Sequence, residues 1–272
     1  MAYGGWGGWG FDRGSPLSVL ELVKAGNLDL KLASLLWLIM EQRASVIVAA
    51  GPSRAGKSTT LDVLLDFLRP EINRIELQGN YEDFAFLKTA KPANSYIVAA
   101  EFSNWGMYVW GETAIRAFEL RSKGFALGGT IHALTARDVV EIFHRYLGLK
   151  VATLTQIDAI ITLSVTGSRI YGAEPIRRIN AVTLVLPHEK GIALDEIVSL
   201  GTDGNSFDMP DEADLQTALS VKFGVKKSSV ATEMKEREKL LGELLKEGKV
   251  SRDEVREAVV GFYRSRPGRE RL

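Results

Sequence analysis

A glycine-rich segment followed by Lys57 and Ser58 has the residue types and the spacing of a phosphate-binding loop. Residues 51 to 59 read GPSRAGKST and match the pattern G-x-x-x-x-G-K-[ST]. In such a loop the backbone N–H groups surround phosphate oxygens, the lysine contacts the β- and γ-phosphates, and the hydroxyl binds Mg²⁺. A turn without a ligand is the alternative, but the strand and helix expected on either side favour a nucleotide site. The sequence thus predicts an ATP site, with Ser58 as the Mg²⁺ ligand, formed by Gly51, Pro52, Ser53, Arg54, Ala55, Gly56, Lys57, Ser58 and Thr59.

Glu101 follows the apolar run SYIVAA at residues 95–100. This run predicts a buried strand, and ligands of open α/β sheets bind at the carboxyl ends of the strands. A carboxylate at that place could hold the water shell of the metal or activate the attacking water. A solvated glutamate at a strand end is the alternative. The phosphate loop earlier in the chain favours a catalytic role for Glu101.

A second acidic group is predicted near the end of the segment NRIEL at residues 73–77. Glu76 lies close to the carboxyl end of this expected strand, and Glu82 and Asp83 follow in the connection. One of them could lie near the metal, and Glu76 is the candidate. A solvated group of loop residues is the alternative.

His132 ends the expected strand FALGGTIH at residues 125–132. Its position predicts a sensor of the γ-phosphate that couples the state of the nucleotide to the helix that follows. A structural histidine is the alternative. His144 and His188 lack such a setting and are expected on the surface or in packing.

The order of the expected elements indicates an α/β fold with a mostly parallel sheet, because short β-branched runs alternate with helical segments. Strands are predicted at 45–50, 73–77, 95–100, 125–132 and 158–165, with helices after the phosphate loop and at 111–124 and 135–148. After about residue 166 the pattern changes. RRINAVTLVL and ALDEIVSL indicate antiparallel strands, and SLGTDGNSFDM reads as a loop.

Helices are also expected at both ends of the chain. Near the start, Ser15 and Pro16 favour a helix cap and first turn, and Asp29 opens a second helix. From Asp211 the chain becomes helical and highly charged, and SSVATEMKEREKLLGELLKEG is expected to end at Gly248. The predicted domains are a Gly/Trp-rich tail at 1–14, an ATPase core at 15–205 and a helical region at 206–272.

The C-terminal helices carry two further signals. Ser251 and Glu254 have the spacing of a capping box. An apolar stripe on the preceding helix must be covered. It packs either on the chain's own core or on another subunit, and packing on another subunit would favour a ring. The stripe consists of Leu240, Leu241, Leu244 and Leu245.

The bulk composition is that of a soluble globular protein. The 272 residues are 46% hydrophobic and 25% charged, and the zero formal net charge gives no indication of nucleic-acid binding. The absence of cysteine excludes disulfides and Cys-ligated metals and fits a cytoplasmic protein. The first residues lack a signal peptide, and the longest apolar run is too short to span a bilayer.

The order of these motifs resembles the secretion ATPase superfamily, which includes the type II and type IV secretion, type IV pilus and archaeal flagellar motor ATPases. The similar segments are LLWLIMEQRASVIVAAGPSRAGKSTTLDVLLDFL, LKTAKPANSYIVAAEF, ETAIRAFELRSKGFALGGTIHALTARDVVEIFHRYLG and EMKEREKLLGELLKEGKVSRDEVREAVVGFYR. The resemblance covers most of residues 15 to 265. It implies a RecA-like P-loop core, a homo-oligomeric hexameric ring, a membrane platform protein as partner, and a place in the cytoplasm or at the inner face of the cell membrane.

The sequence departs from the family pattern at several places. Ser103 stands where the family has an arginine two residues after the catalytic glutamate, and Ile75-Glu76-Leu77 is a reduced form of its acidic box. Arg54 replaces a frequent glycine, and most of the family's N-terminal domain is expected to be lacking. We therefore expect ATP binding with slow hydrolysis. The alternatives are a nucleotide-binding regulator with little hydrolysis and a P-loop kinase of small molecules, for which the basic residues of AEPIRRI would be a weak lid candidate.

Overall fold

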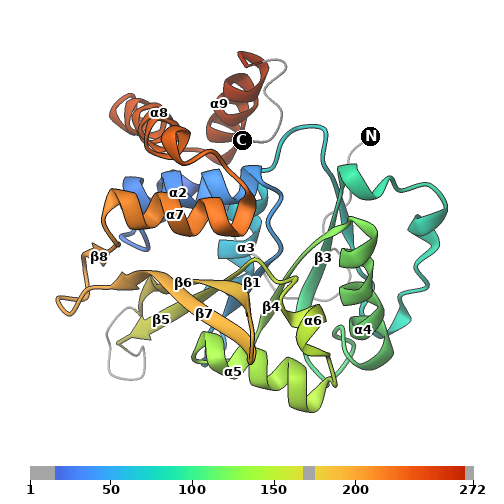
Figure 1. Cartoon of the computed structure of the whole chain (residues 1–272). Helices are drawn as coiled ribbons and strands as arrows, with labels where there is room; N and C mark the ends of the chain where they lie inside the picture. The colour runs from blue at the N-terminus through green and yellow to red at the C-terminus, as the bar shows by residue number, and fades with distance from the viewer. Residues whose placement is uncertain (1–15, 168–174, 267–272) are drawn as a thin grey trace.

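A single twisted sheet forms the centre of the computed structural model, which describes residues 16–167 and 175–266 (Figure 1). Eight strands lie in the order β2-β3-β4-β1-β5-β6-β7-β8 within these residues. The strands are β1 (Val46–Ala49), β2 (Asn73–Glu76), β3 (Ser95–Phe102), β4 (Ala126–Ile131), β5 (Ala159–Thr166), β6 (Ile176–His188), β7 (Gly191–Leu200) and β8 (Phe207–Asp208).

The first five strands are parallel, and β4 lies between β1 and β3. The phosphate-loop segment leaves β1, and Glu101 lies near the end of β3, so these two segments come from strands separated by one other strand. The predicted α/β class with a mostly parallel sheet is confirmed. The predicted strands agree with the observed ones to within two residues at each end.

The antiparallel part is also as expected, because β6 pairs with β5 and β7 pairs with β6. The segment expected as a loop contains β8, where Leu200 pairs with Phe207 and Ser199 with Asp208. That part of the prediction was wrong. Two residues are too few to give a periodic pattern in the sequence.

Nine α-helices are described in residues 16–167 and 175–266. They are α1 (Val19–Lys24), α2 (Leu30–Glu41), α3 (Lys57–Leu65), α4 (Gly111–Glu119), α5 (Ala136–Glu141), α6 (Val151–Leu154), α7 (Glu212–Phe223), α8 (Lys227–Lys246) and α9 (Arg252–Arg264). The expected long helices at 111–124 and 135–148 are shorter α-helices, extended by a 3₁₀ turn at Leu120–Lys123 and a π-helical segment at Ile142–Tyr146.

The first helix begins later than predicted. Ser18, and not Ser15, is the N-cap of α1, because its hydroxyl accepts the N–H of Glu21 and the Glu21 carboxylate accepts the N–H of Ser18. This capping box satisfies two N–H groups at once, whereas a cap at Ser15 would place Pro16 to Ser18 in the helix without that exchange. Asp29 caps α2 as predicted.

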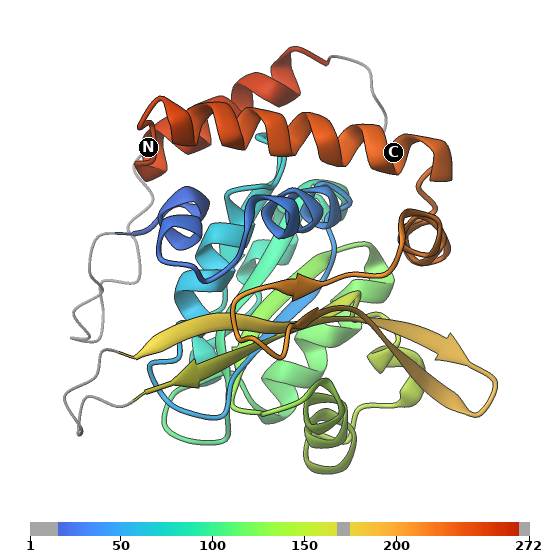
Figure 2. The same cartoon turned by 90° about the vertical axis from the view of Figure 1, so that its left-hand side faces the viewer.

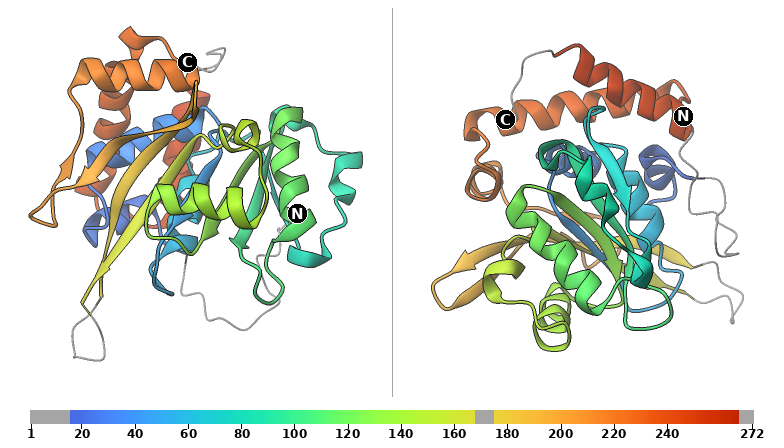
Figure 3. Two further views of the ribbon diagram at one scale, coloured as in Figure 1. Left: turned by 60° about the horizontal axis from the view of Figure 1, so that its bottom comes forward. Right: turned by 90° about the vertical axis from the view of Figure 1, so that its right-hand side faces the viewer.

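The helices cover both faces of the sheet. Along β1, Val46 and Val48 face one apolar core, and Ile47 and Ala49 face the other, as the alternation of side chains in a strand requires. The core on the first face includes α1, α2, α3, α7, α8 and α9. The core on the second face includes α4 and α5, which Figure 3 shows together with α6 on the side away from α8.

The C-terminal helices pack on the core instead of leaving an apolar face open. Helix α8 crosses over α2, as Figure 2 shows at its upper edge. Leu241 and Leu244 are buried in the first core, and Leu240 and Leu245 pack against it. The apolar stripe therefore packs on the chain itself and gives no support for a ring. The division of the chain at residue 205 stays a prediction.

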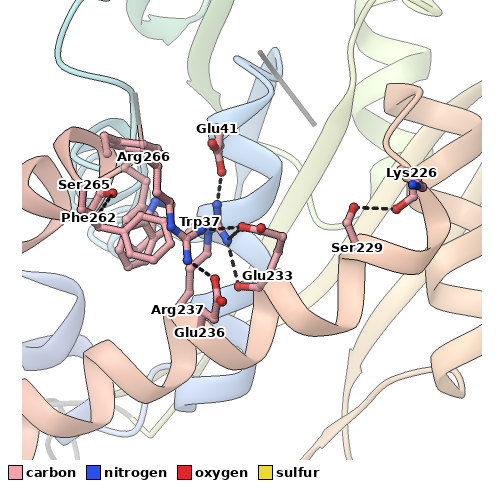
Figure 4. A network of polar contacts seen from close by, with 12 residues as sticks. Trp37, Glu41, Lys226, Ser229, Glu233, Glu236, Arg237, Phe262, Ser265 and Arg266 are labelled. Atoms are coloured by element: carbon pink, nitrogen blue, oxygen red, sulfur yellow. Dashed lines mark hydrogen bonds and ion pairs between the residues drawn. The ribbon is translucent and has the colours of Figure 1, made fainter. Parts of the chain in front are cut away.

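A buried network of charges fastens α8 and α9 to α2 (Figure 4). Arg237 of α8 is fully buried and pairs with Glu41 of α2 and, at 2.7 Å, with Glu233. Glu41 also pairs with Arg69 at 2.6 Å, and Glu233 with Arg266 at 2.9 Å. Each buried charge thus has an opposite charge as a partner, which is what burial of charged groups requires.

The capping box predicted at the start of α9 is present, since Ser251 and Glu254 form its reciprocal bonds. Among the described helices, none has the length and the apolar character needed to cross a membrane.

Candidate nucleotide-binding and catalytic site

The first turn of α3 is built to receive an anion. Its N-cap is Gly56, which has a left-handed φ of 94° and provides no side-chain cap. A helix begins with N–H groups that have no partner inside the helix, and its N-terminus has a partial positive charge. The glycine conformation turns the loop onto the helix and leaves these N–H groups available to phosphate oxygens.

Lys57, the first residue of α3, points toward the ends of the neighbouring strands. Its side chain is only 6% exposed, and its Nζ lies 3.0 Å from His132 Nε2 and 3.9 Å from a Glu101 carboxylate oxygen. Burial lowers the pKa of the Lys57 ammonium below its ordinary value, and the Glu101 charge partly offsets this effect. Lys57 is thus a largely buried cation that a phosphate could pair with.

His132 joins the phosphate loop to the acid. Its Nδ1 lies 2.9 Å from the Gly51 carbonyl oxygen, and its Nε2 lies 3.6 Å from Glu101. A carbonyl can only accept, so the proton of a neutral His132 is on Nδ1, and Nε2 can accept a hydrogen bond from Lys57. His132 thus contacts both Lys57 and the phosphate loop, so a group that binds Lys57 could change the hydrogen bonds of His132.

Glycines in β4 allow β3 to approach closely enough to place Glu101 at the site. A Cβ added at Gly129 would lie 2.4 Å from the Phe102 ring, and one at Gly128 would lie 2.8 Å from the Tyr96 ring. The Thr130 hydroxyl donates to the Ala100 carbonyl at 2.6 Å, next to a register shift between Ala99 and Phe102. These contacts fix the end of β3, where the Glu101 side chain is 18% exposed.

Glu76 lies on the strand next to Glu101 but earlier along the sheet. Glu76 is exposed on the edge strand β2 and stands in register with Val98, three residues before Glu101. Glu82 and Asp83 accept backbone N–H groups of their own loop, from Gln78, Phe84 and Ala85. The sequence could not separate these acids, because strand length and turn bonds decide which carboxylate reaches the site.

Ser58 fits its predicted role as a metal ligand. It is exposed in the first turn of α3, next to Lys57 and on the same loop that would hold the phosphates. Mg²⁺ prefers oxygen ligands, keeps several waters and usually takes only one or two ligands from the protein, with phosphates supplying others. The Ser58 hydroxyl and the Glu101 carboxylate, which lies 3.9 Å from Lys57 Nζ, are oxygen ligands of this kind.

One cation beside the loop was missed by the sequence-based prediction of the site. Arg177 of β6 donates from Nε to the carbonyl oxygen of Arg54 at 3.0 Å. From the sequence, the basic pair Arg177-Arg178 is predicted only as a weak candidate for the lid of a kinase. Its place beside the loop depends on β6 folding back next to β5, which no local pattern reveals.

Proton uptake on binding is a first testable consequence of the burial of Lys57. Because burial lowers the pKa of free Lys57, part of this group is neutral at alkaline pH, and a bound phosphate favours the charged form. We expect ATP binding to take up protons at alkaline pH and to weaken as the pH rises, because the neutral form of free Lys57 must gain a proton when phosphate binds. Calorimetric titrations in two buffers of different ionisation enthalpy measure this uptake. Uptake that does not increase with pH would contradict the assignment of Lys57 to the phosphate site.

The comparison with known sequences gives two relatives. No protein-family model matches the chain. The chain is 20% identical over 256 residues to uncharacterized protein MJ1287 of Methanocaldococcus jannaschii, which covers 83% of this chain and 91% of the relative. A shorter match to uncharacterized protein MJ0900 of the same organism is 36% identical over 55 residues, or 20% of this chain and 10% of the relative.

Three solved structures are similar at low TM-scores. The VirB11 ATPase of the Brucella suis type IV secretion system is 19% identical with a TM-score of 0.39, over 61% of this chain and 54% of that one. The ATPase DotB of Yersinia pseudotuberculosis is 15% identical with a TM-score of 0.38, over 91% and 63%. DotB of Legionella pneumophila is 11% identical with a TM-score of 0.35, over 91% and 66%. The chain thus spans about half to two thirds of the length of these structures.

Proposed function

We propose that the chain binds Mg-ATP at the phosphate loop and hydrolyses it slowly. The observation that carries this proposal is the convergence of Lys57, Glu101 and His132 beside Gly51, with Nζ to Nε2 and Nζ to carboxylate distances of 3.0 and 3.9 Å. These three side chains come from α3, β3 and the end of β4. A cation, a carboxylate and an imidazole at the mouth of a phosphate loop are the groups that phosphoryl transfer to water needs.

Each residue has a role in this reaction. The backbone of residues 51–56 and Lys57 hold the β- and γ-phosphates, and Ser58 holds the metal, which neutralises phosphate charge when bound. Glu101 accepts a proton from the water that attacks the γ-phosphorus, the bond to the ADP oxygen breaks, and ADP and phosphate leave. His132, bonded to the Gly51 carbonyl, reports the loss of the γ-phosphate to α5.

We expect slow turnover because a serine stands where an arginine would neutralise charge on the transferred phosphoryl group. Ser103 stands two residues after Glu101, and its hydroxyl accepts the N–H of Trp105 at 3.1 Å. A serine there cannot neutralise charge in the transition state, whereas an arginine in phosphoryl transfer contributes roughly 10³-fold or more. A neighbouring subunit or another protein could supply such a group.

A motor subunit of a secretion or type IV pilus-like machine is the proposed setting. The resemblance of the motif order to secretion ATPases supports it. On this proposal the chain forms a hexameric ring and works on a membrane platform protein at the inner face of the cell membrane. Because the stripe on α8 packs inside the chain, only the sequence resemblance supports the ring. Light scattering at high concentration with ATP tests it, and a chain that stays monomeric would contradict it.

The binding half of the proposal is tested by Lys57→Ala. Removing the ammonium leaves phosphate charge uncompensated in a partly dry loop, so the Kd for Mg-ATP should rise at least tenfold, which is about 1.4 kcal/mol. Calorimetry measures this change. Lys190→Ala is the matched control, because Lys190 is exposed at the turn between β6 and β7. Equal affinity of wild type and Lys57→Ala would refute the proposed site.

Two alternatives use the same loop with different outcomes. A regulator would bind ATP with little hydrolysis, and a small-molecule kinase would transfer the phosphoryl group to a second substrate. Free phosphate as the product supports the ATPase. A phosphorylated small molecule would support the kinase, and bound but intact ATP the regulator.

A further inference from the structure

Arg177 lies beside the phosphate loop at Arg54 and Gly56. Its Nε donates to the Arg54 carbonyl at 3.0 Å, and its Cδ lies 3.5 Å from the place where a Cβ on Gly56 would stand. Together with Ala55 and Thr60 it also lines a cavity of about 10 Å³ between α1, α3 and β6. The side chain thus lies along residues 54 to 56, and its guanidinium is at the loop.

The strand order puts Arg177 and Glu101 on opposite sides of the loop. Glu101 lies on β3 and His132 follows β4, whereas Arg177 lies on β6, beyond β5. The Nζ of Lys57 points to the Glu101 side, and this lysine type contacts the β- and γ-phosphates. The γ-phosphate end is therefore on the Glu101 side, and Arg177 lies on the side of the α- and β-phosphates.

The neighbouring arginine has a different task. Arg178 donates to the carbonyl oxygens of Gly26 at 2.6 Å and Gly204 at 2.8 Å, and to the side chain of Asn205 at 2.9 Å. These bonds tie β6 to the turn after α1 and to the loop before β8. Arg178 thus fixes the strand, while Arg177 contacts the loop.

We infer that Arg177 binds the α- and β-phosphates of the nucleotide, as a second cation opposite Lys57. This inference rests on the proposed function and adds a ligand residue to its site. A guanidinium has five N–H donors in a fixed plane, and one bond to the Arg54 carbonyl leaves others that can reach phosphate oxygens. The bond to Arg54 holds the side chain in place before the nucleotide arrives. Arg177 is a binding residue, and the γ-phosphate chemistry stays with Glu101.

Titrations of Arg177→Ala with Mg-ATP and with ADP test the inference. Both nucleotides carry the α- and β-phosphates, so both Kd values should rise about tenfold, equal to about 1.4 kcal/mol. Arg177→Lys should recover part of the loss, because it restores the charge without the planar pair of donors. Arg256→Ala is the control for loss of an arginine, since Arg256 is exposed on α9. Thermal unfolding of each nucleotide-free variant tests whether the variant is as stably folded as wild type.

The outcomes separate the inference from the proposed function. If wild type binds both nucleotides and Arg177→Ala binds them equally well, the inference is wrong and the proposed function stands. If only ATP binding weakens, Arg177 contacts the γ-phosphate and the placement is wrong. If wild type binds neither nucleotide, the proposed function is wrong, and the inference, which rests on it, is wrong as well.

Discussion

Glu101→Gln should reduce steady-state phosphate release by 10²-fold or more and should leave ATP bound as tightly as in wild type or more tightly. The substitution keeps the size of the side chain and removes the base, and loss of a general base typically costs about 10²–10⁴-fold. It also removes a negative charge that lies 3.9 Å from Lys57 and close to the place of the γ-phosphate. Release of phosphate from saturating ATP gives the rate, and calorimetry gives the Kd.

Two matched variants make this result specific. Glu76→Gln should leave the rate close to that of wild type, because Glu76 is exposed on β2 and stands in register with Val98, three residues before Glu101. Glu119→Gln, on an exposed position of α4, controls for removal of any surface carboxylate. Equal rates for wild type and Glu101→Gln would leave Glu101 without a catalytic role and would favour the regulator.

Arg237→Met should destabilise the fold by about 3 kcal/mol, since removal of one partner from a buried ion pair typically costs about 3–5 kcal/mol. Arg237 is fully buried between Glu41 and Glu233, and its guanidinium lies 4.8 Å from the centre of the Phe262 ring. The value is at the lower end because Arg69 and Arg266 still pair with the two carboxylates. Urea unfolding, followed by circular dichroism, measures the change in the free energy of unfolding.

A second variant separates charge from packing at this network. In Arg237→Met the Glu41 carboxylate loses its pair with Arg237. Adding Glu41→Gln removes this buried negative charge, so the double variant should recover part of the lost stability. Arg256→Met on the exposed side of α9 should change the free energy of unfolding by less than about 0.5 kcal/mol. An unchanged unfolding midpoint for Arg237→Met would contradict a structural role of the network.

The sequence predicted the parallel half of the sheet because its strands are continuous apolar runs that end at recognisable residues. β1, β3, β4 and β5 are buried over most of their length, so each is a short apolar segment bounded by polar or glycine residues. The same feature located Glu101 and His132, since both follow such a run directly. The capping box of α1 was also visible in the segment SVLE, but Ser15-Pro16 offered a competing start.

Other features depend on contacts between distant segments. β8 has only two residues, and α6 has four, so neither has a periodic pattern. Arg177 reaches the loop because β6 returns antiparallel to β5, and the stripe on α8 is covered because α8 crosses α2. Whether Glu76 lies near the loop as well as Glu101 depends on how far each strand extends toward it. Such information belongs to tertiary packing and is absent from local spacing.

A single-turnover measurement tests the central claim most directly. The full chain, in excess over labelled Mg-ATP and at a concentration above the measured Kd, is mixed and sampled over time for free phosphate. The account predicts that wild type converts the bound ATP to ADP and one phosphate, slowly and completely, while Glu101→Gln keeps the ATP intact over the same period. Bound ATP that stays intact in wild type, at low and at high chain concentration, would contradict hydrolysis and leave a nucleotide-binding regulator.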